Sequence, residues 1–274
     1  MNGKHASRRT LGARESYLLS SLSAAGFTVF TVQDAVALLG EPPATVHTLL
    51  SHLAAKGWLE RLARGKYLIL PLEAGPEGRY GEHEYLVAAR LVQPYYLAYA
   101  TALHHYGYTE LRPPAVHIAT TARKQPLTVM GVHYCFVTLS QHKFFGLAQA
   151  TMAGQPVIFS DRGKTVVDSL DRPDLAGGAI EAAKALWFGQ DELDLEQVVA
   201  YGRRLGNRVA LRRLGFWLER LERGTPALLE QLEDRQGHSY ARLDTRGPAG
   251  GPRHPRWRLI VNVPEKQLLE WREH

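Results

Sequence analysis

The residues best suited to catalysis are an aspartate and a lysine that follow a strand-like run. Asp161 and Lys164 come directly after the sequence VIFS, and an acid with a lysine near a metal ion would suit a nuclease core. Their spacing is short, and no second acid lies in a suitable strand. A carboxylate at the start of a helix can instead accept hydrogen bonds from the free backbone N–H groups of the first turn. We therefore expect Asp161 to cap a helix over about 163–170, with a metal-dependent nuclease as the alternative.

Histidines and a single cysteine are the other candidates for site chemistry. His104 and His105 are adjacent, so they would point to different sides of a helix, and together with His133 they are better explained as surface or core residues. Cys135 lies among aromatic and apolar residues, which predicts an inert position in the core. The chain has no phosphate-cradling glycine loop, Ser/His/Asp order or zinc spacing. We predict no catalytic residue, metal or cofactor.

Residues 31–70 are the most informative stretch, because they have the pattern of two short amphipathic helices followed by two strands around an Arg-Gly turn. Thr31 and Asp34 form a box-like start for the first of these helices, and Gly40 ends it. Pro43 presets the start of the second, over about 43–56, which should bury apolar residues at helical spacing. With a further helix over about 15–25, this succession predicts a winged helix-turn-helix.

The face of the helix over 43–56 that lies opposite its apolar stripe carries small or polar side chains, which suit close approach to a major groove. It has no Arg or Asn to read bases by paired hydrogen bonds. We therefore expect sequence discrimination to be modest, or to depend on water and DNA shape. The wing tip at 63–65 would carry cations toward phosphates. The predicted DNA-contacting residues are Ala44, Thr45, His47, Thr48, Ser51, His52, Lys56, Arg64 and Lys66. A winged helix used only for protein contact is the alternative.

A second cluster of cations lies at 203–223, where seven arginines accompany two acids. An apolar stripe at helical spacing should be buried there, which would leave Arg208, Arg212 and Arg223 facing outward. One interpretation is a solvated helix with a Glu219–Arg223 pair, contributing only ~0.2–0.5 kcal/mol. The other is a second nucleic-acid surface. The sequence leaves both open.

The remaining pattern predicts an α+β protein with two domains. Residues 71–80 have the composition of a linker, which divides a winged helix-turn-helix domain at 1–75 from a larger mixed α+β domain at 82–274. In the second domain we expect helices at 84–92 and 97–106, strands between 115 and 160, and a helical portion at 177–234. The strand expected at 257–263 would complete its sheet.

Composition is that of a globular protein, with 45% hydrophobic and 22% charged residues. The net charge of +6, from 33 basic and 27 acidic residues, favours a polyanion only where the cations cluster, and they do so partly in the basic amino-terminal arm and the wing. No apolar run approaches the ~18 residues that would span a bilayer. With a single cysteine and no apolar stretch after the basic start, we expect a cytoplasmic protein with no membrane contact.

Several runs in order along the chain resemble the AbiEi family, over about residues 14–264. Besides the winged helix they are PYYLAYATALHHYGYTEL (94–111), VHIATT (116–121), PVIFSDRGKTVVDSLDRPDLAGG (156–178) and WRLIVNV (257–263). AbiEi proteins are antitoxins of type IV toxin–antitoxin systems and are linked to phage defence. The resemblance implies a winged helix that represses its operon by binding promoter repeats. It also implies a second domain that counteracts a nucleotidyltransferase toxin without requiring a stable complex.

The sequence thus predicts a cytoplasmic transcriptional repressor and antitoxin that binds operator repeats in double-stranded DNA and has no catalytic step. Two alternatives come from other classes of protein. One is the nuclease centred on Asp161 and Lys164. The other is a ligand-sensing winged-helix regulator, which a deep apolar pocket lined by Tyr95, Tyr96 and Tyr106 would support.

Overall fold

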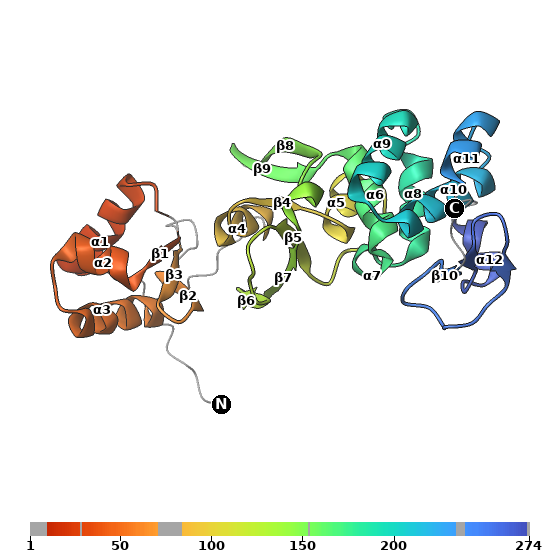
Figure 1. Ribbon diagram of the computed structural model, residues 1–274. Helices are drawn as coiled ribbons and strands as arrows, with labels where there is room; N and C mark the ends of the chain where they lie inside the picture. Colours follow the sequence, from red (N-terminus) through yellow and green to blue (C-terminus); the bar gives the residue numbers. More distant parts are fainter. Residues whose placement is uncertain (1–9, 28, 71–83, 153, 234–238, 273–274) are drawn as a thin grey trace. The chain divides into compact units, whose positions relative to one another are not determined.

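The computed structural model describes residues 10–27, 29–70, 84–152, 154–233 and 239–272 (Figure 1). The chain divides into two compact units, one of residues 1–93 with 126–134 and one of residues 94–125 with 135–274. This division differs from the predicted boundary, because 84–93 and 126–134 group with the first unit. The basic arm before residue 10 and the linker expected at 71–80 lie outside the described residues.

The first unit begins with three helices and a small antiparallel sheet whose strand order is β1-β3-β2. This unit has a two-strand hairpin, called the wing, after its third helix, which is the order of elements that the sequence predicted. Its described elements are α1 (Ala13–Ala24), β1 (Val29–Thr31), α2 (Val32–Leu39), α3 (Pro43–Ala55), β2 (Leu59–Ala63), β3 (Lys66–Ile69), α4 (Glu84–Leu91) and β6 (Leu127–Val129).

The ends of α2 and the start of α3 form where the sequence predicted them. The backbone N–H of Asp34 donates to Thr31 Oγ1 at 3.3 Å, and the backbone N–H of Thr31 donates to Asp34 Oδ2 at 2.7 Å. This capping box satisfies backbone donors that the first turn leaves free. Gly40 then ends α2 with a φ of 66°, a left-handed conformation that glycine adopts without steric cost. Pro43 occupies the first turn of α3.

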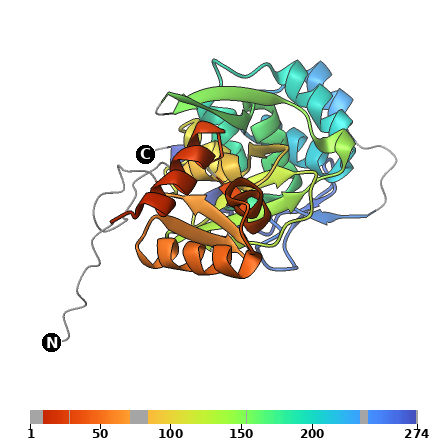
Figure 2. The same ribbon diagram turned by 90° about the vertical axis from the view of Figure 1, so that its left-hand side faces the viewer.

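The core of the first unit fixes which side of α3 is turned inward. Val46, Leu49, Leu50 and Leu53 are buried with the leucines of α1 and the stacked rings of Phe30 and Tyr67. In Figures 1 and 2, α1, α2 and the strands β1 to β3 lie on one side of α3. The opposite side of α3 is therefore left uncovered by these elements.

The second unit contains a mixed sheet in the order β7-β5-β4-β9-β8, in which β4 and β9 are parallel and the pairs β4–β5 and β8–β9 are antiparallel. The start of β7 pairs with β6 in the first unit. The described elements are β4 (Tyr95–Leu97), α5 (Ala100–His105), β5 (Val116–Thr120), β7 (Val132–Thr138), η2 (Gln141–Lys143), β8 (Leu147–Met152), β9 (Gln155–Ser160), α6 (Arg162–Asp171), α7 (Pro173–Ala176), α8 (Ala179–Phe188), α9 (Leu195–Leu205), α10 (Arg208–Arg220), α11 (Pro226–Leu232), β10 (Ala241–Arg242), β11 (Arg253–His254), β12 (Leu259–Ile260), α12 (Glu265–Leu269) and η3 (Glu270–Arg272).

One strand of this sheet was missed in the sequence, and one expectation about the sheet is wrong. The helix expected at 97–106 is present as the shorter α5, but the strand β4 in front of it was not expected, because the run that starts at Tyr95 is fully buried in the sheet. Such a strand lacks the alternation that distinguishes strands from helices in a sequence. The closing strand β12 does not join the large sheet. It pairs with β10 and β11 in a separate three-stranded sheet.

The helical portion of the second unit packs around α6, which contacts α8, α9 and α10 (Figure 1). Gly215 of α10 is needed for close packing, because a Cβ there would lie 2.1 Å from the buried ring of Trp257. Within the described ranges, none of the helices is both long enough and apolar enough to cross a membrane.

Candidate nucleic-acid interface

The uncovered face of α3 carries six of the nine residues predicted to contact DNA. Ala44, Thr45, His47, Thr48, Ser51 and His52 are all exposed. They lie opposite the buried stripe. Four of them have small side chains and the other two are histidines, so the helix backbone can approach another surface closely. The structure places these six residues together, as the helical period predicted.

Lys56, at the end of α3, is not a free cation. Its Nζ lies 2.7 Å from Glu15 Oε2 and 2.8 Å from Glu15 Oε1. Burial would raise the pKa of Glu15, but hydrogen bonds from Lys56 and from the backbone N–H of Gly12 outweigh it and lower this pKa. A phosphate would have to compete with this carboxylate for Lys56, so sequence analysis overstated its availability.

A shallow hollow of about 470 Å³ lies where the first half of α3 meets the start of α1. Thr48 Oγ1 donates to the backbone carbonyl of Ala44 at 3.1 Å, so the hydroxyl is directed back at its own helix. Arg14 is ion-paired with Glu41. Sequence analysis missed Arg14, because only the fold brings α1 next to α3. The residues that line the hollow are Arg14, Ala44, Thr45, Thr48, Leu49 and His52.

The wing is short, and its tip is fixed against the start of α2. Gly65 has a φ of 72°, which suits the tight turn between β2 and β3. Its carbonyl accepts a 3.0 Å hydrogen bond from the backbone N–H of Val32. Arg64 at the tip is exposed and Lys66 is half-buried. Two cations therefore lie on a hairpin whose backbone is held in place.

In α10, the predicted outward arrangement of arginines is wrong for Arg212, and Arg223 is only half-exposed. Arg212 is 5% exposed and donates to the carbonyl of Ser239 at 2.9 Å, while Arg223 donates to the carbonyl of Leu186 at 2.5 Å. The expected Glu219–Arg223 pair is also replaced, because Glu219 bonds Arg256 and Trp257. Arg208 is exposed. The guanidinium groups of Arg212 and Arg223 therefore bind backbone carbonyls of this unit instead of facing outward.

The side chains of Asp161 and Lys164 have different partners. Asp161 Oδ1 accepts the backbone N–H of Lys164 at 2.7 Å, so it caps α6 as expected, and its Oδ2 accepts from the Tyr201 hydroxyl at 2.9 Å. The Lys164 side chain is fully buried and ion-paired with Asp168, and its Nζ donates to the Tyr96 hydroxyl at 3.1 Å. Burial raises the pKa of Asp168 against the opposing effect of Lys164.

The remaining candidates are three histidines and one cysteine. His105 stacks on Phe159 with ring centroids 3.8 Å apart, while His104 and His133 are exposed. Across the described part of the chain, no three His, Cys, Asp or Glu residues gather where they could hold a metal. Cys135 is half-buried, not fully in the core as expected.

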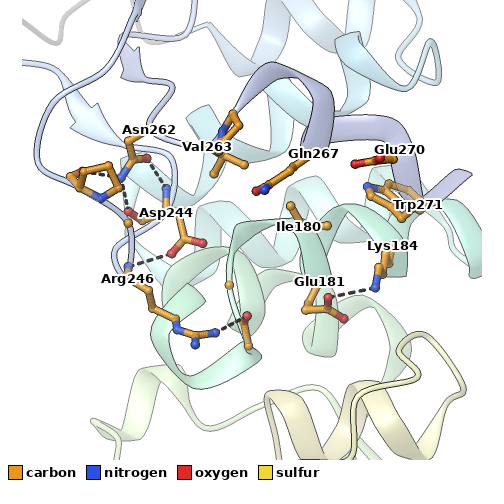
Figure 3. Close-up of a pocket in the computed structure, with 15 residues that line it drawn as sticks. Ile180, Glu181, Lys184, Asp244, Arg246, Asn262, Val263, Gln267, Glu270 and Trp271 are labelled. Atoms are coloured by element: carbon orange, nitrogen blue, oxygen red, sulfur yellow. Dashed lines mark hydrogen bonds and ion pairs between the residues drawn. The ribbon is translucent and has the colours of Figure 1, made fainter.

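The tyrosines proposed to line a ligand pocket are engaged in packing and hydrogen bonds among the described residues. Tyr95 and Tyr96 are buried within the sheet, and the Tyr106 hydroxyl donates to the carbonyl of Ser160 at 2.8 Å. A cavity of about 670 Å³ lies elsewhere, between α8 and the carboxy-terminal segment (Figure 3).

The walls of this larger cavity explain the paired glycines that end the run DRPDLAGG. Asp244 Oδ2 accepts the backbone N–H of Ala179 at 3.0 Å, which caps α8, and a Cβ on Gly178 would lie 2.9 Å from that oxygen. Gly178 also has a φ of 124°, which other residues rarely adopt. Glu181 pairs with Lys184 at 3.1 Å on the same wall (Figure 3). Part of the motif is therefore explained by packing and capping.

Comparisons with known proteins agree with this architecture. Residues 18–69 match the family model described as "Transcriptional regulator, AbiEi antitoxin". The chain is also similar to the crystal structure of the RV2827C protein from Mycobacterium tuberculosis, with a TM-score of 0.68 and 18% sequence identity over 100% of this chain and 99% of that one. At this identity the likeness concerns the fold alone. No curated protein matches the chain. The resemblance to AbiEi regulators is confirmed for the segment that contains α2, α3 and the wing.

Proposed function

We propose that this protein is a cytoplasmic DNA-binding transcriptional repressor that also serves as the antitoxin of a type IV toxin–antitoxin system. One observation carries the proposal: the exposed small-side-chain face of α3 lies inside the segment that matches AbiEi regulators. A face of this composition fits closely against a major groove, where larger side chains would hold the helix away.

In the proposed mechanism, α3 enters the major groove at each repeat of the operator in its own promoter. Arg64 and Lys66 of the wing contact the phosphate backbone and set the register of α3, while the face of α3 meets base edges. The second unit either orients two such contacts on neighbouring repeats or acts on the pathway of a nucleotidyltransferase toxin. It does so without a stable complex with that toxin.

DNA binding is tested by fluorescence anisotropy with a duplex taken from the region upstream of the encoding gene. Replacing Arg64 and Lys66 together by Ala should weaken binding to all sequences by similar factors and flatten the salt dependence by about two phosphate contacts. Replacing Ser51 by Ala should instead change the ratio of affinities between sequences. Lys266→Ala, at an exposed position in α12, controls for the loss of positive charge alone. The same uniform weakening from both sets of changes would contradict this division of roles.

The antitoxin role is tested in cells. A nucleotidyltransferase encoded beside this gene should arrest growth when expressed alone, and co-expression of this protein should restore growth. Restoration without co-purification of the two proteins is the result expected for type IV action. Continued arrest despite full expression of this protein would remove the antitoxin half of the proposal and leave DNA binding standing.

The proposal includes no catalytic step, which separates it from the nuclease alternative. Purified protein incubated with supercoiled plasmid and magnesium should leave the plasmid intact. Nicking that disappears in Asp161→Asn would support a nuclease instead.

A further inference from the structure

The hollow beside α3 is formed by neighbouring turns of one helix. Residues 44, 45, 48, 49 and 52 recur at the spacing of a single helix flank, and Arg14 closes the rim from α1. All six residues belong to the first unit, and five of them lie on the helix that the proposed function places in the major groove. A group that projects from a base edge could therefore enter this hollow as α3 docks.

The centre of the hollow is apolar. Ala44 offers only a methyl group, and Leu49 is 9% exposed, so its side chain lies at the floor. Because the Thr48 hydroxyl is directed to the carbonyl of Ala44, its methyl group is the part of the side chain left to contact a ligand. The cation at the rim, Arg14, is ion-paired with Glu41. The hollow thus offers methyl groups where many recognition helices offer hydrogen-bond donors.

The edges of the four base pairs in the major groove present hydrogen-bonding groups and one apolar group, the C5-methyl of thymine. We infer that this hollow is a specificity site for the C5-methyl group of a pyrimidine in each operator half-site. In DNA that group comes from thymine or from 5-methylcytosine. This inference rests on the proposed function and adds the chemistry by which α3 distinguishes sequences despite lacking Arg and Asn.

The test removes that methyl group and nothing else. The full chain is first footprinted on the promoter duplex, and each thymine in the footprint is then replaced singly by deoxyuridine, which keeps every hydrogen-bonding group. One position per half-site should lose affinity about fourfold, the factor expected for removing one methyl group from a buried contact. At that position, cytosine should bind more weakly than 5-methylcytosine. The comparison of cytosine with 5-methylcytosine distinguishes the effect of the methyl group from that of the rest of the thymine base.

Two variants of one residue link the effect to the hollow. Thr48→Ser removes the methyl group and keeps the hydroxyl, so the ratio of thymine to uracil affinity should fall to about one. Thr48→Val keeps a methyl group at this place and should preserve that ratio, whatever its overall affinity. Both changes are at an exposed position, so neither should prevent folding.

The possible failures are distinguishable. If the duplex binds but no uracil substitution weakens it, the inference is overturned and the proposed function stands. A methyl effect of the same size in Thr48→Ser would also overturn it, because the methyl group would then be sensed elsewhere. If no promoter duplex binds at all, the proposed function fails and the inference fails with it.

Discussion

Helix α3 of the first unit and helix α10 of the second both carry polar side chains at helical spacing, yet they use them differently. The polar residues on the outer face of α3 are exposed. In α10, Arg212 and Arg213 are buried and donate to backbone carbonyls of Ser239, Leu170 and Arg242. Burial lowers the pKa of Arg213 to about 10, so even this strong base is held at some electrostatic cost.

The comparison teaches that a count of cations does not measure the positive charge available to a ligand. The arginines of α9 support this conclusion. Although Arg203 and Arg204 are exposed, one donates to Gln231 at 3.2 Å and the other lies 4.1 Å from the centre of the Phe145 ring. Several arginines of the richer cluster are thus held by contacts within the protein, whereas the modest charge of the wing is held on a fixed hairpin.

The largest effect is expected from breaking the buried ion pair between Lys164 and Asp168 in the second unit. Lys164→Met leaves Asp168, which is 2% exposed, without its cationic partner, and this should cost ~3–5 kcal/mol of unfolding free energy. Urea unfolding measures the loss. The double variant Lys164→Met with Asp168→Leu should recover part of it, because no unpaired charge then remains. A double variant less stable than Lys164→Met would contradict this account.

A second difference between the two units concerns their histidines. Those on α3 are exposed, whereas His117 in β5 of the second unit is buried, so a pH titration of stability should reveal it. Burial lowers the pKa of His117 to about 4, whereas an unfolded chain protonates histidine near ~6.5. Between these values the unfolded state binds the extra proton, so stability falls as pH drops from ~6.5 toward 4, by up to about 3 kcal/mol in total. Unfolding free energies of wild type and His117→Leu across this range measure the effect. An equal dependence on pH in both proteins would rule out His117 as its source.

The smallest expected effect is a difference in stability between variants of two arginines in α10, Arg212 and Arg208. Arg212→Met should destabilise the second unit by ~1–3 kcal/mol, because the Ser239 carbonyl loses a donor. Arg208→Met, at an exposed position, should change stability by no more than ~0.5 kcal/mol. Both are measured by denaturant unfolding. Similar losses from the two variants would contradict the expectation that the buried position contributes more to stability than the exposed one.

Sequence reasoning succeeded where local rules decide the structure. Thr31, Gly40 and Pro43 fix helix ends through interactions within a few residues, and the period of α3 separates its buried and exposed faces. The same holds for Asp161, which caps α6 as expected. In these places the residue and its partner are neighbours in sequence.

Sequence reasoning failed where a residue's interaction partner is distant in the sequence. No local pattern indicates that Arg212 meets Ser239, that Lys56 meets Glu15, or that β12 leaves the large sheet. The strand β4 was missed because a strand buried on both faces resembles a short apolar helix segment. The hollow beside α3 also needed the fold, because Arg14 reaches it from another helix.

The ion pair between Glu15 and Lys56 joins residues 41 positions apart and fastens the carboxy-terminal end of α3 to the start of α1. With its other side packed on leucines of the core, α3 has its tilt set within the first unit, so in the proposed function no duplex is needed to orient it. Association then costs little conformational entropy in the helix itself. Under that proposal, discrimination between DNA sequences would depend on how well each duplex adapts to this rigid surface.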